Sequence, residues 1–236
     1  MLDEQTLHRS DDSAVGGDWL QTWGGRELPL HDFGLSAGTA NAAVEPRETA
    51  RVLSGIERFG ARCLKTYVVA DHSLRVAWRV RELGGSVLDQ FYALNHEGDE
   101  SLLGFDPPSP LLAICPDLRV VKRRAHLAYF ARYALSPELP AVVKEADLDL
   151  LVTERRDLMR RPPRPWHPSL EARALAVLPE MSQIYPIHPS DARELWLGEW
   201  VRLGTELVRD YRAEIGPDAH AALASAVVDS RHWDQP

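Results

Sequence analysis

Residues 190–216 have the sequence SDARELWLGEWVRLGTELVRDYRAEIG and predict the fold class most plainly. Ser190 can cap a helix, because its side-chain oxygen can accept a hydrogen bond from an N–H of the first turn. Apolar residues then recur at steps of three and four, which places them on one face of a helix. They are Trp196, Trp200, Leu203, Leu207, Tyr211 and Ile215. Because Gly216-Pro217 stops the pattern, we predict an amphipathic helix over 190–215, with a shorter alanine-rich helix over about 218–228.

A proline-rich segment, Arg161-Pro162-Pro163-Arg164-Pro165, separates this region from an upstream helix that is expected to end near Arg160. The chain then passes through Trp166-His167-Pro168-Ser169-Leu170 and reaches Ile184-Tyr185-Pro186-Ile187-His188. Pro179 interrupts the stretch between them. Residues 170–185 could therefore form a helix and a turn or two short strands, and periodicity does not separate the two.

Helical signals fill residues 45–95. Pro46 suits a first helical position, and Val52, Ile56, Phe59, Cys63 and Tyr67 recur at helical steps, so one helix is expected to run through Tyr67. A second helix, capped by Asp71 or Ser73, is expected to stop at Gly84-Gly85. Ser86-Val87-Leu88-Asp89 resembles a capping box that begins a third.

Residues 96–110 are rich in Gly and Pro and are predicted to form a loop. Residues 111–115 could be a strand or a buried turn, and residues 117–135 and 137–160 predict two more helices. The glycine-rich residues 1–44 show no sustained period and are expected to be an arm that lies on its own domain or on a partner. The predicted fold is mostly α: a bundle-like helical domain (45–161), followed by a small α+β or helical C-terminal domain (166–236).

Composition excludes several classes of protein. The chain has 236 residues and a formal net charge of −8, which opposes non-specific binding to nucleic acid. Its N-terminus lacks the pattern of a signal peptide, and it contains no apolar run of the ~18 residues that a membrane span needs. Cys63 and Cys115 are expected to be free thiols. We therefore expect a cytoplasmic protein that contacts neither membrane nor nucleic acid.

No catalytic signature of high specificity occurs, and we predict no catalytic residue, no metal ligand and no cofactor in this chain. Asp71-His72-Ser73 brings together three residue types of a hydrolytic triad, but such groups converge in space rather than in sequence, so a helix cap is expected. His96-Glu97-Gly98-Asp99-Glu100 is the densest group of possible metal ligands. A solvated loop is expected there, because side chains at consecutive positions do not point at one ion without a special turn.

Arginines crowd the predicted end of the helix before the proline-rich segment, and Trp166 follows them. They are Arg155, Arg156, Arg160, Arg161 and Arg164. Cations at this end of a helix offset the partial negative charge of its carbonyls, which is a structural role. Guanidinium groups can also bind carboxylates through two hydrogen bonds, which is a binding role, and both interpretations stay open.

The order of motifs over residues 60–190 resembles the partner proteins of multinuclear non-haem iron oxidases, the methanobactin synthase type, which modify ribosomally made peptides. The motifs are Glu145-Ala146-Asp147-Leu148-Asp149-Leu150, the proline-rich segment, His167-Pro168-Ser169-Leu170, Leu178-Pro179 and Ile184-Tyr185-Pro186-Ile187-His188, with Leu64-Lys65-Thr66-Tyr67 and the stretch from Leu83 to Tyr92 as looser matches.

This resemblance implies a non-catalytic subunit that binds the leader of a precursor peptide near residues 170–185 and presents it to the iron oxidase, its partner in a heterodimer. The residues expected to bind peptide or partner are Arg155, Arg156, Arg160, Trp166, His167, Tyr185 and His188.

Two alternatives from other classes remain. A small-molecule tailoring enzyme would need a pocket, for which His72, Tyr92, His96 and His126 are the candidates. A DNA-binding regulator would need a contiguous basic face.

Overall fold

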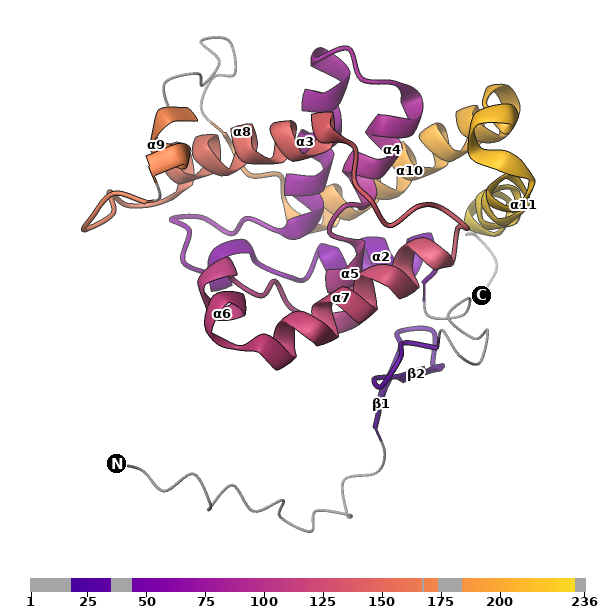
Figure 1. The fold of residues 1–236 in the computed structure, drawn as a ribbon, viewed down its shortest axis with the longest axis horizontal. Helices are drawn as coiled ribbons and strands as arrows, with labels where there is room; N and C mark the ends of the chain where they lie inside the picture. The colour runs from indigo at the N-terminus through magenta and orange to yellow at the C-terminus, as the bar shows by residue number, and fades with distance from the viewer. Residues whose placement is uncertain (1–17, 35–43, 167, 174–183, 232–236) are drawn as a thin grey trace.

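The computed structural model describes residues 18–34, 44–166, 168–173 and 184–231. It confirms a mostly helical protein (Figure 1). A two-stranded antiparallel sheet pairs β1 (Trp19–Gln21) with β2 (Glu27–Pro29). The α-helices are α2 (Pro46–Leu53), α3 (Val69–Glu82), α4 (Val87–Asn95), α5 (Gly98–Leu103), α6 (Ser109–Ile114), α7 (Pro116–Ala131), α8 (Ala141–Leu158), α9 (Pro168–Arg173), α10 (Pro189–Asp210) and α11 (Arg212–Arg231).

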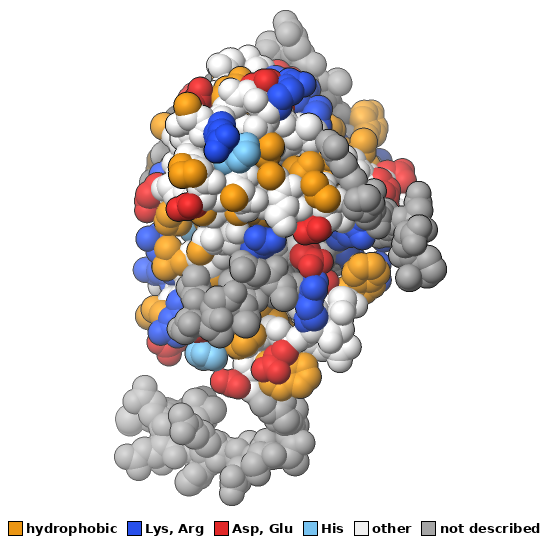
Figure 2. All heavy atoms as spheres, turned by 90° about the vertical axis from the view of Figure 1, so that its right-hand side faces the viewer, with side chains coloured by type: hydrophobic (Ala, Val, Ile, Leu, Met, Phe, Trp, Pro, Cys, Tyr) orange, Lys and Arg blue, Asp and Glu red, His pale blue; other side chains and the backbone are white. Residues whose placement is uncertain are grey.

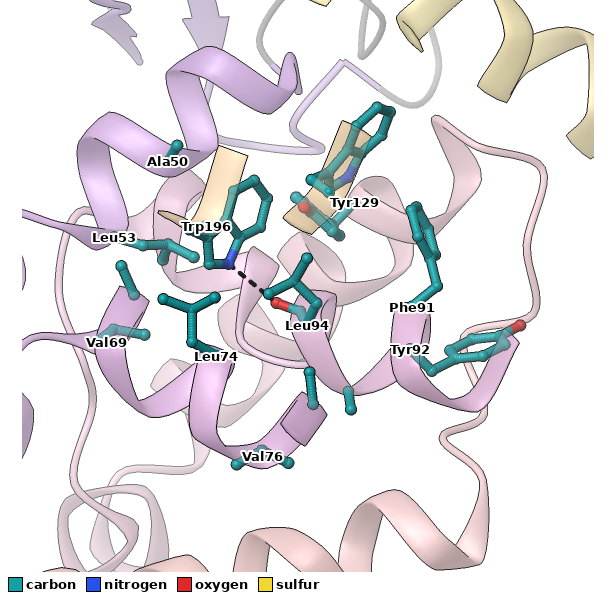
Figure 3. Close-up of a cluster of buried hydrophobic side chains, with 14 of the residues drawn as sticks. Ala50, Leu53, Val69, Leu74, Val76, Phe91, Tyr92, Leu94, Tyr129 and Trp196 are labelled. Atoms are coloured by element: carbon teal, nitrogen blue, oxygen red, sulfur yellow. Dashed lines mark hydrogen bonds between the residues drawn. The ribbon is translucent and has the colours of Figure 1, made fainter. Parts of the chain in front are cut away.

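The core lies where α3 and α4 meet α10. Trp196 and Trp200 of α10 are fully buried. The Trp196 indole N–H donates to the carbonyl of Leu94, 3.2 Å away (Figure 3), and Trp200 packs against Phe91 and Tyr133. The predicted apolar stripe of this helix is therefore core, and residues after the proline-rich segment complete the same core as the upstream helices.

The predicted end of α3 and the predicted start of α4 are both confirmed. Gly84 has φ +80°, a left-handed conformation that glycine adopts without steric cost, and it ends α3. Ser86 and Asp89 then form a reciprocal capping box at the start of α4. Because these two signals lie next to each other, α3 and α4 form a tight antiparallel pair (Figure 1).

The helix predicted from Pro46 through Tyr67 is wrong beyond Leu53. Past Gly55 the chain turns back on itself: the Val69 N–H donates to the Ile56 carbonyl, and the Arg58 N–H donates to the Tyr67 carbonyl. Phe59 and Ala61 both have positive φ, which bulky and β-carbon-bearing residues seldom adopt. This long-range backbone pairing overrides the helical period. We call residues 56–68 the strap.

Three further predictions fail between residues 71 and 115. Asp71 does not cap α3 but lies buried in its first turn, bonded to Arg75 and to the N–H of Ile187. The predicted loop contains α5, whose Asp99 and Glu100 are buried, so His96 to Glu100 is not a solvated loop. Residues 109–114 form helix α6 rather than a strand or turn. Prolines at the first positions of α6 and α7 begin helices here instead of breaking them.

The last two helices also have boundaries that differ from prediction. Helix α10 ends at Asp210, and Tyr211 and Ile215 lie beyond it. Helix α11 starts earlier than expected and continues to Arg231 across a non-helical Gly216. Residues 168–173 are helical, while residues 174–183 lie outside the described part of the chain.

The hairpin of β1 and β2 contacts its own chain. Glu48 of α2 accepts hydrogen bonds from the N–H groups of Trp23 and Gly24, and Arg51 lies 5.2 Å from the centre of the Trp23 ring. Leu28 is buried in the core. Over these residues the arm therefore lies on its own domain. Among the described residues, no helix has the length and apolar character that crossing a membrane requires.

Charged side chains of both signs alternate on the face shown in Figure 2. The described part of this face thus offers no contiguous basic surface of the kind that a DNA-binding regulator needs. Both cysteines are unpaired, as expected.

Gly98 provides a test of packing beside the candidate site. A β-carbon at this position would lie 2.2 Å from ring atoms of Tyr129, a buried side chain whose hydroxyl donates to Asn95. We expect Gly98→Ala to destabilise the protein by roughly 1–3 kcal/mol, because overpacking forces rigid neighbours apart. Urea unfolding measures this change.

The matched control is Gly198→Ala in α10, where an added β-carbon meets no atom within 4 Å. Alanine exceeds glycine in helix propensity, so this variant should gain roughly 0.5–1 kcal/mol. Equal stability of the two variants would contradict the close packing of α5 on α7.

Candidate metal site

Three side chains from three helices converge in the interior. His72 lies in α3, His96 is the C-terminal cap of α4 and Asp147 lies in α8. His72 Nε2 is 3.2 Å from His96 Nε2 and 3.2 Å from Asp147 Oδ1, and His96 Nε2 is 3.8 Å from the same oxygen. Each residue can therefore offer one ligand atom to a shared ion.

The outer nitrogen of His72 fixes its tautomer. Nδ1 lies 2.6 Å from Oε1 of the buried Glu154. The same oxygen accepts a hydrogen bond from the Tyr67 hydroxyl at 2.8 Å, and Arg58 Nε lies 3.3 Å from the other oxygen. A carboxylate that already binds cationic and hydroxyl donors accepts hydrogen bonds, so Nδ1 carries the proton. Nε2 therefore faces His96 and Asp147, and it offers them a lone pair whenever the ring is neutral.

Glu154 keeps its charge despite full burial. Burial alone would raise the pKa of its carboxyl, but Arg58, His72 and Tyr67 outweigh that effect and hold the pKa below its usual value. The strap positions two of these partners, because its turn at Phe59 and Ala61 directs Arg58 inward and its return places Tyr67 against α8.

The outer nitrogen of His96 is fixed in the same way. Nδ1 lies 2.6 Å from the carbonyl oxygen of Ala93, which can only accept a hydrogen bond. Nδ1 therefore carries the proton, and Nε2 presents its lone pair to His72. Burial lowers the pKa of His96 below its usual value, which favours this neutral ring.

Two nitrogen lone pairs and a carboxylate oxygen thus face one another, and this arrangement is repulsive unless a cation lies between them. Ligands about 2.0–2.1 Å from a zinc ion in tetrahedral geometry are about 3.3 Å apart, close to the separations here. Donation of the outer N–H to a carboxylate or to a backbone carbonyl is also the usual support of a metal-bound histidine.

Without a metal ion, a proton on His72 can partly offset this repulsion. Burial and the Arg58 guanidinium lower the pKa of His72, but Glu154 and Asp147 outweigh them and raise it to about 9. Burial would raise the pKa of the Asp147 carboxyl, but the hydrogen bond and the charge of His72 hold it below the usual value.

Glu97 adds a carboxylate at the edge of the cluster. Its Oε1 is 3.7 Å from His96 Nε2 and 3.4 Å from Arg58 Nη1, and its Oε2 is 3.5 Å from Lys122 Nζ. Burial would raise the pKa of Glu97, but Lys122, His96 and Arg58 hold it well below its usual value. Glu97 is therefore an ionised fourth candidate ligand.

Helices α5 and α7 surround Glu97 with a second polar group. Lys122 Nζ lies 2.9 Å from Asp99 and 3.0 Å from Glu100, and His126 Nδ1 lies 3.6 Å from Asp99. Burial and the charge of Glu97 raise the pKa of Glu100 well above its usual value. Lys122 thus lies among three carboxylates, Glu97, Asp99 and Glu100, beside the cluster.

The cluster opens to solvent on one side. The side chains of His72 and His96 are 0% and 5% exposed, whereas that of Asp147 is 36% exposed. Asp147 is therefore the ligand candidate that lies nearest to solvent.

The predicted peptide-binding residues lie apart from this cluster. Arg155, Arg160 and Trp166 line one hollow beyond the end of α8, while Arg156 pairs with Asp157. The carbonyl of Tyr185 accepts from Arg75, and His188 caps α10 through the N–H of Ser190. His167 lies outside the described residues. A role of these residues in peptide binding stays a prediction.

Of the residues considered for a tailoring enzyme, the structure brings His72 and His96 into contact. Tyr92 and His126 instead each pack against the Phe130 ring. The metal cluster escaped sequence reasoning because its ligands lie on different helices, so a search for short histidine spacings does not find them. The usable signal was the adjacent His96-Glu97 pair, with a second histidine upstream and an aspartate downstream.

No protein-family model matches the chain. The chain is 31% identical over 145 residues to a protein of Escherichia coli K12 whose name is "Uncharacterized protein YfdR". The alignment covers 61% of this chain and 76% of that protein.

Proposed function

We propose that this chain, which belongs to the same family as Escherichia coli YfdR, is a metal-dependent hydrolase whose ion is held by His72, His96 and Asp147. One observation carries the proposal: the lone pairs of two histidines and a carboxylate oxygen converge, and each histidine donates its outer N–H to an acceptor.

The donor set selects the class of metal. Two imidazoles and one or two carboxylates suit divalent transition metals such as zinc, manganese, iron or nickel. Calcium and magnesium prefer sites made of oxygen alone. Both cysteines lie outside the cluster, so no thiolate contributes to it.

The support for hydrolysis is a candidate ion site that has a further carboxylate, Glu97, at its edge. A bound divalent ion supplies a water molecule of lowered pKa, or polarises the bond to be cleaved. On the protein side, the carboxylate of Glu97 lies 3.7 Å from His96 Nε2 and can accept a hydrogen bond from that water.

A metal-dependence assay tests this function. Protein treated with EDTA and then supplied with manganese, zinc, nickel or iron is assayed on p-nitrophenyl phosphate, bis(p-nitrophenyl) phosphate and p-nitrophenyl acetate. We expect hydrolysis of at least one substrate to require added metal. His96→Ala should remove this hydrolysis, while His31→Gln, an exposed residue of the hairpin, should not.

If none of these metals gives hydrolysis of any of the three substrates, the proposal that the protein is a hydrolase is contradicted. Consumption of oxygen by the iron-loaded protein would instead indicate an oxygenase, because two histidines and a carboxylate also hold non-haem iron.

The accessory role that the sequence resemblance implies is a separate proposal with a different requirement. A subunit that only presents a precursor peptide needs no metal of its own, since the iron ligands would belong to its partner. Co-purification with an iron oxidase would favour that role over hydrolysis, provided that the His96→Ala variant still supports modification of the precursor peptide by the oxidase.

A further inference from the structure

A hollow of about 470 Å³ lies beyond the C-terminal end of α8, separate from the three metal-ligand candidates. Four arginines and a tryptophan line it: Arg62, Arg155, Arg160, Arg161 and Trp166. We call it the arginine hollow. Its remaining walls come from the strap and from Pro162 and Pro163.

Backbone contacts build this hollow from two segments distant in sequence. Helix α8 ends at Leu158, whose carbonyl accepts a hydrogen bond from the Leu64 N–H at 2.8 Å. This bond holds the strap against the helix end. Trp166 closes the other side, with its ring 6.4 Å from that of Phe59 and 5.3 Å from the Arg155 guanidinium.

The charged side chains that line the hollow are all arginines. None of its lining residues is acidic. Arg62 donates hydrogen bonds to the backbone carbonyls of Phe59 and Gly60, which carry no net charge. Arg160 and Arg161 are exposed and have no ion pair within the described residues. Elsewhere arginines such as Arg156 and Arg209 pair with an adjacent aspartate.

We propose that the arginine hollow binds a small molecule that carries two or more phosphate groups. Guanidinium groups bind phosphate through two parallel hydrogen bonds, and several of them around one space favour a multiply charged anion. The volume is within the range of roughly 300–1,000 Å³ that is usual for small-molecule sites. A nucleic acid is disfavoured, because the chain as a whole has a net charge of −8.

This binding is independent of the hydrolase proposal, and the experiment keeps the two apart. Calorimetry with inorganic pyrophosphate uses metal-free Asp147→Asn protein, so that no bound ion can capture the phosphate. We expect saturable binding that weakens at least tenfold in Arg160→Ala/Arg161→Ala, since both side chains are exposed and their loss leaves the fold intact.

The control removes the same charge elsewhere, through Arg81→Ala/Arg123→Ala on α3 and α7, and should bind as the parent does. If both double variants lost the same affinity for pyrophosphate, the loss would follow from the change in net charge, and the proposal would be overturned. Absence of pyrophosphate binding would overturn it as well, and binding of a glutamate-rich peptide alone would assign the hollow to an acidic peptide.

Discussion

The Asp147→Asn variant will bind a divalent ion roughly 10- to 100-fold more weakly than the unaltered protein. Its rate of metal-dependent hydrolysis will fall by about 100-fold or more. The substitution keeps the shape of the side chain but removes the charge that faces His72 at 3.2 Å. Stability should change less than on substitution of the fully buried Glu154, because the Asp147 side chain is 36% exposed. Zinc or manganese titration by calorimetry measures the affinity.

Asp149→Asn is the matched control. Asp149 lies one half-turn along α8 and pairs with Arg79 at 3.2 Å instead of facing the histidines. This variant should keep metal affinity and activity within twofold. A parallel loss in both variants would indicate a general effect of charge on α8 and would contradict the role given to Asp147.

Glu154→Gln will lower the free energy of unfolding by about 3–5 kcal/mol, the usual cost of removing one partner from a buried ion pair. Arg58 would keep only Glu97, 3.4 Å away, as a close partner. The variant will also bind metal roughly 10- to 100-fold more weakly, because the amide holds the His72 ring less firmly than the carboxylate does. Chemical unfolding and metal titration measure the two effects separately.

Glu82→Gln serves as its control, because Glu82 forms an exposed ion pair with Arg79 on α3. Such pairs contribute only about 0–1 kcal/mol, so this variant should resemble the parent. If Glu154→Gln were as stable as Glu82→Gln and bound metal normally, Glu154 would not support His72 as described.

Much of the helical framework could be predicted from sequence because its signals are local. The capping box of Ser86 and Asp89, the stop at Gly84 and the apolar stripe through Trp196 and Trp200 depend on residues within a few positions of one another. When such local signals agree with the final fold, a short stretch of sequence is enough to recognise the helix that they begin or end.

The strap shows why other elements could not be predicted. Ile56 and Tyr67 fit a helical period, but their backbone groups bond to Val69 and Arg58 across a turn. The polar groups that the strap buries, Arg58 and Tyr67, find their partner in Glu154, far along the chain. Contacts between residues so far apart in the sequence cannot be recognised from a short stretch of it.

The candidate site escaped prediction for the same reason. His96 and Glu97 are adjacent, but His72 and Asp147 reach them only because α3, α4 and α8 pack together. The arginine cluster, in contrast, is contiguous in sequence and was apparent at once. The fold adds to it the strap and Trp166, which turn a charged helix end into a hollow.

Anomalous diffraction tests the central claim most directly. Crystals grown with zinc and measured on both sides of the zinc absorption edge should show one strong anomalous peak bound by His72 Nε2, His96 Nε2 and Asp147 Oδ1, at about 2.0–2.2 Å from each ligand. A map without a peak between these atoms, under conditions that load zinc elsewhere on the protein, would contradict it.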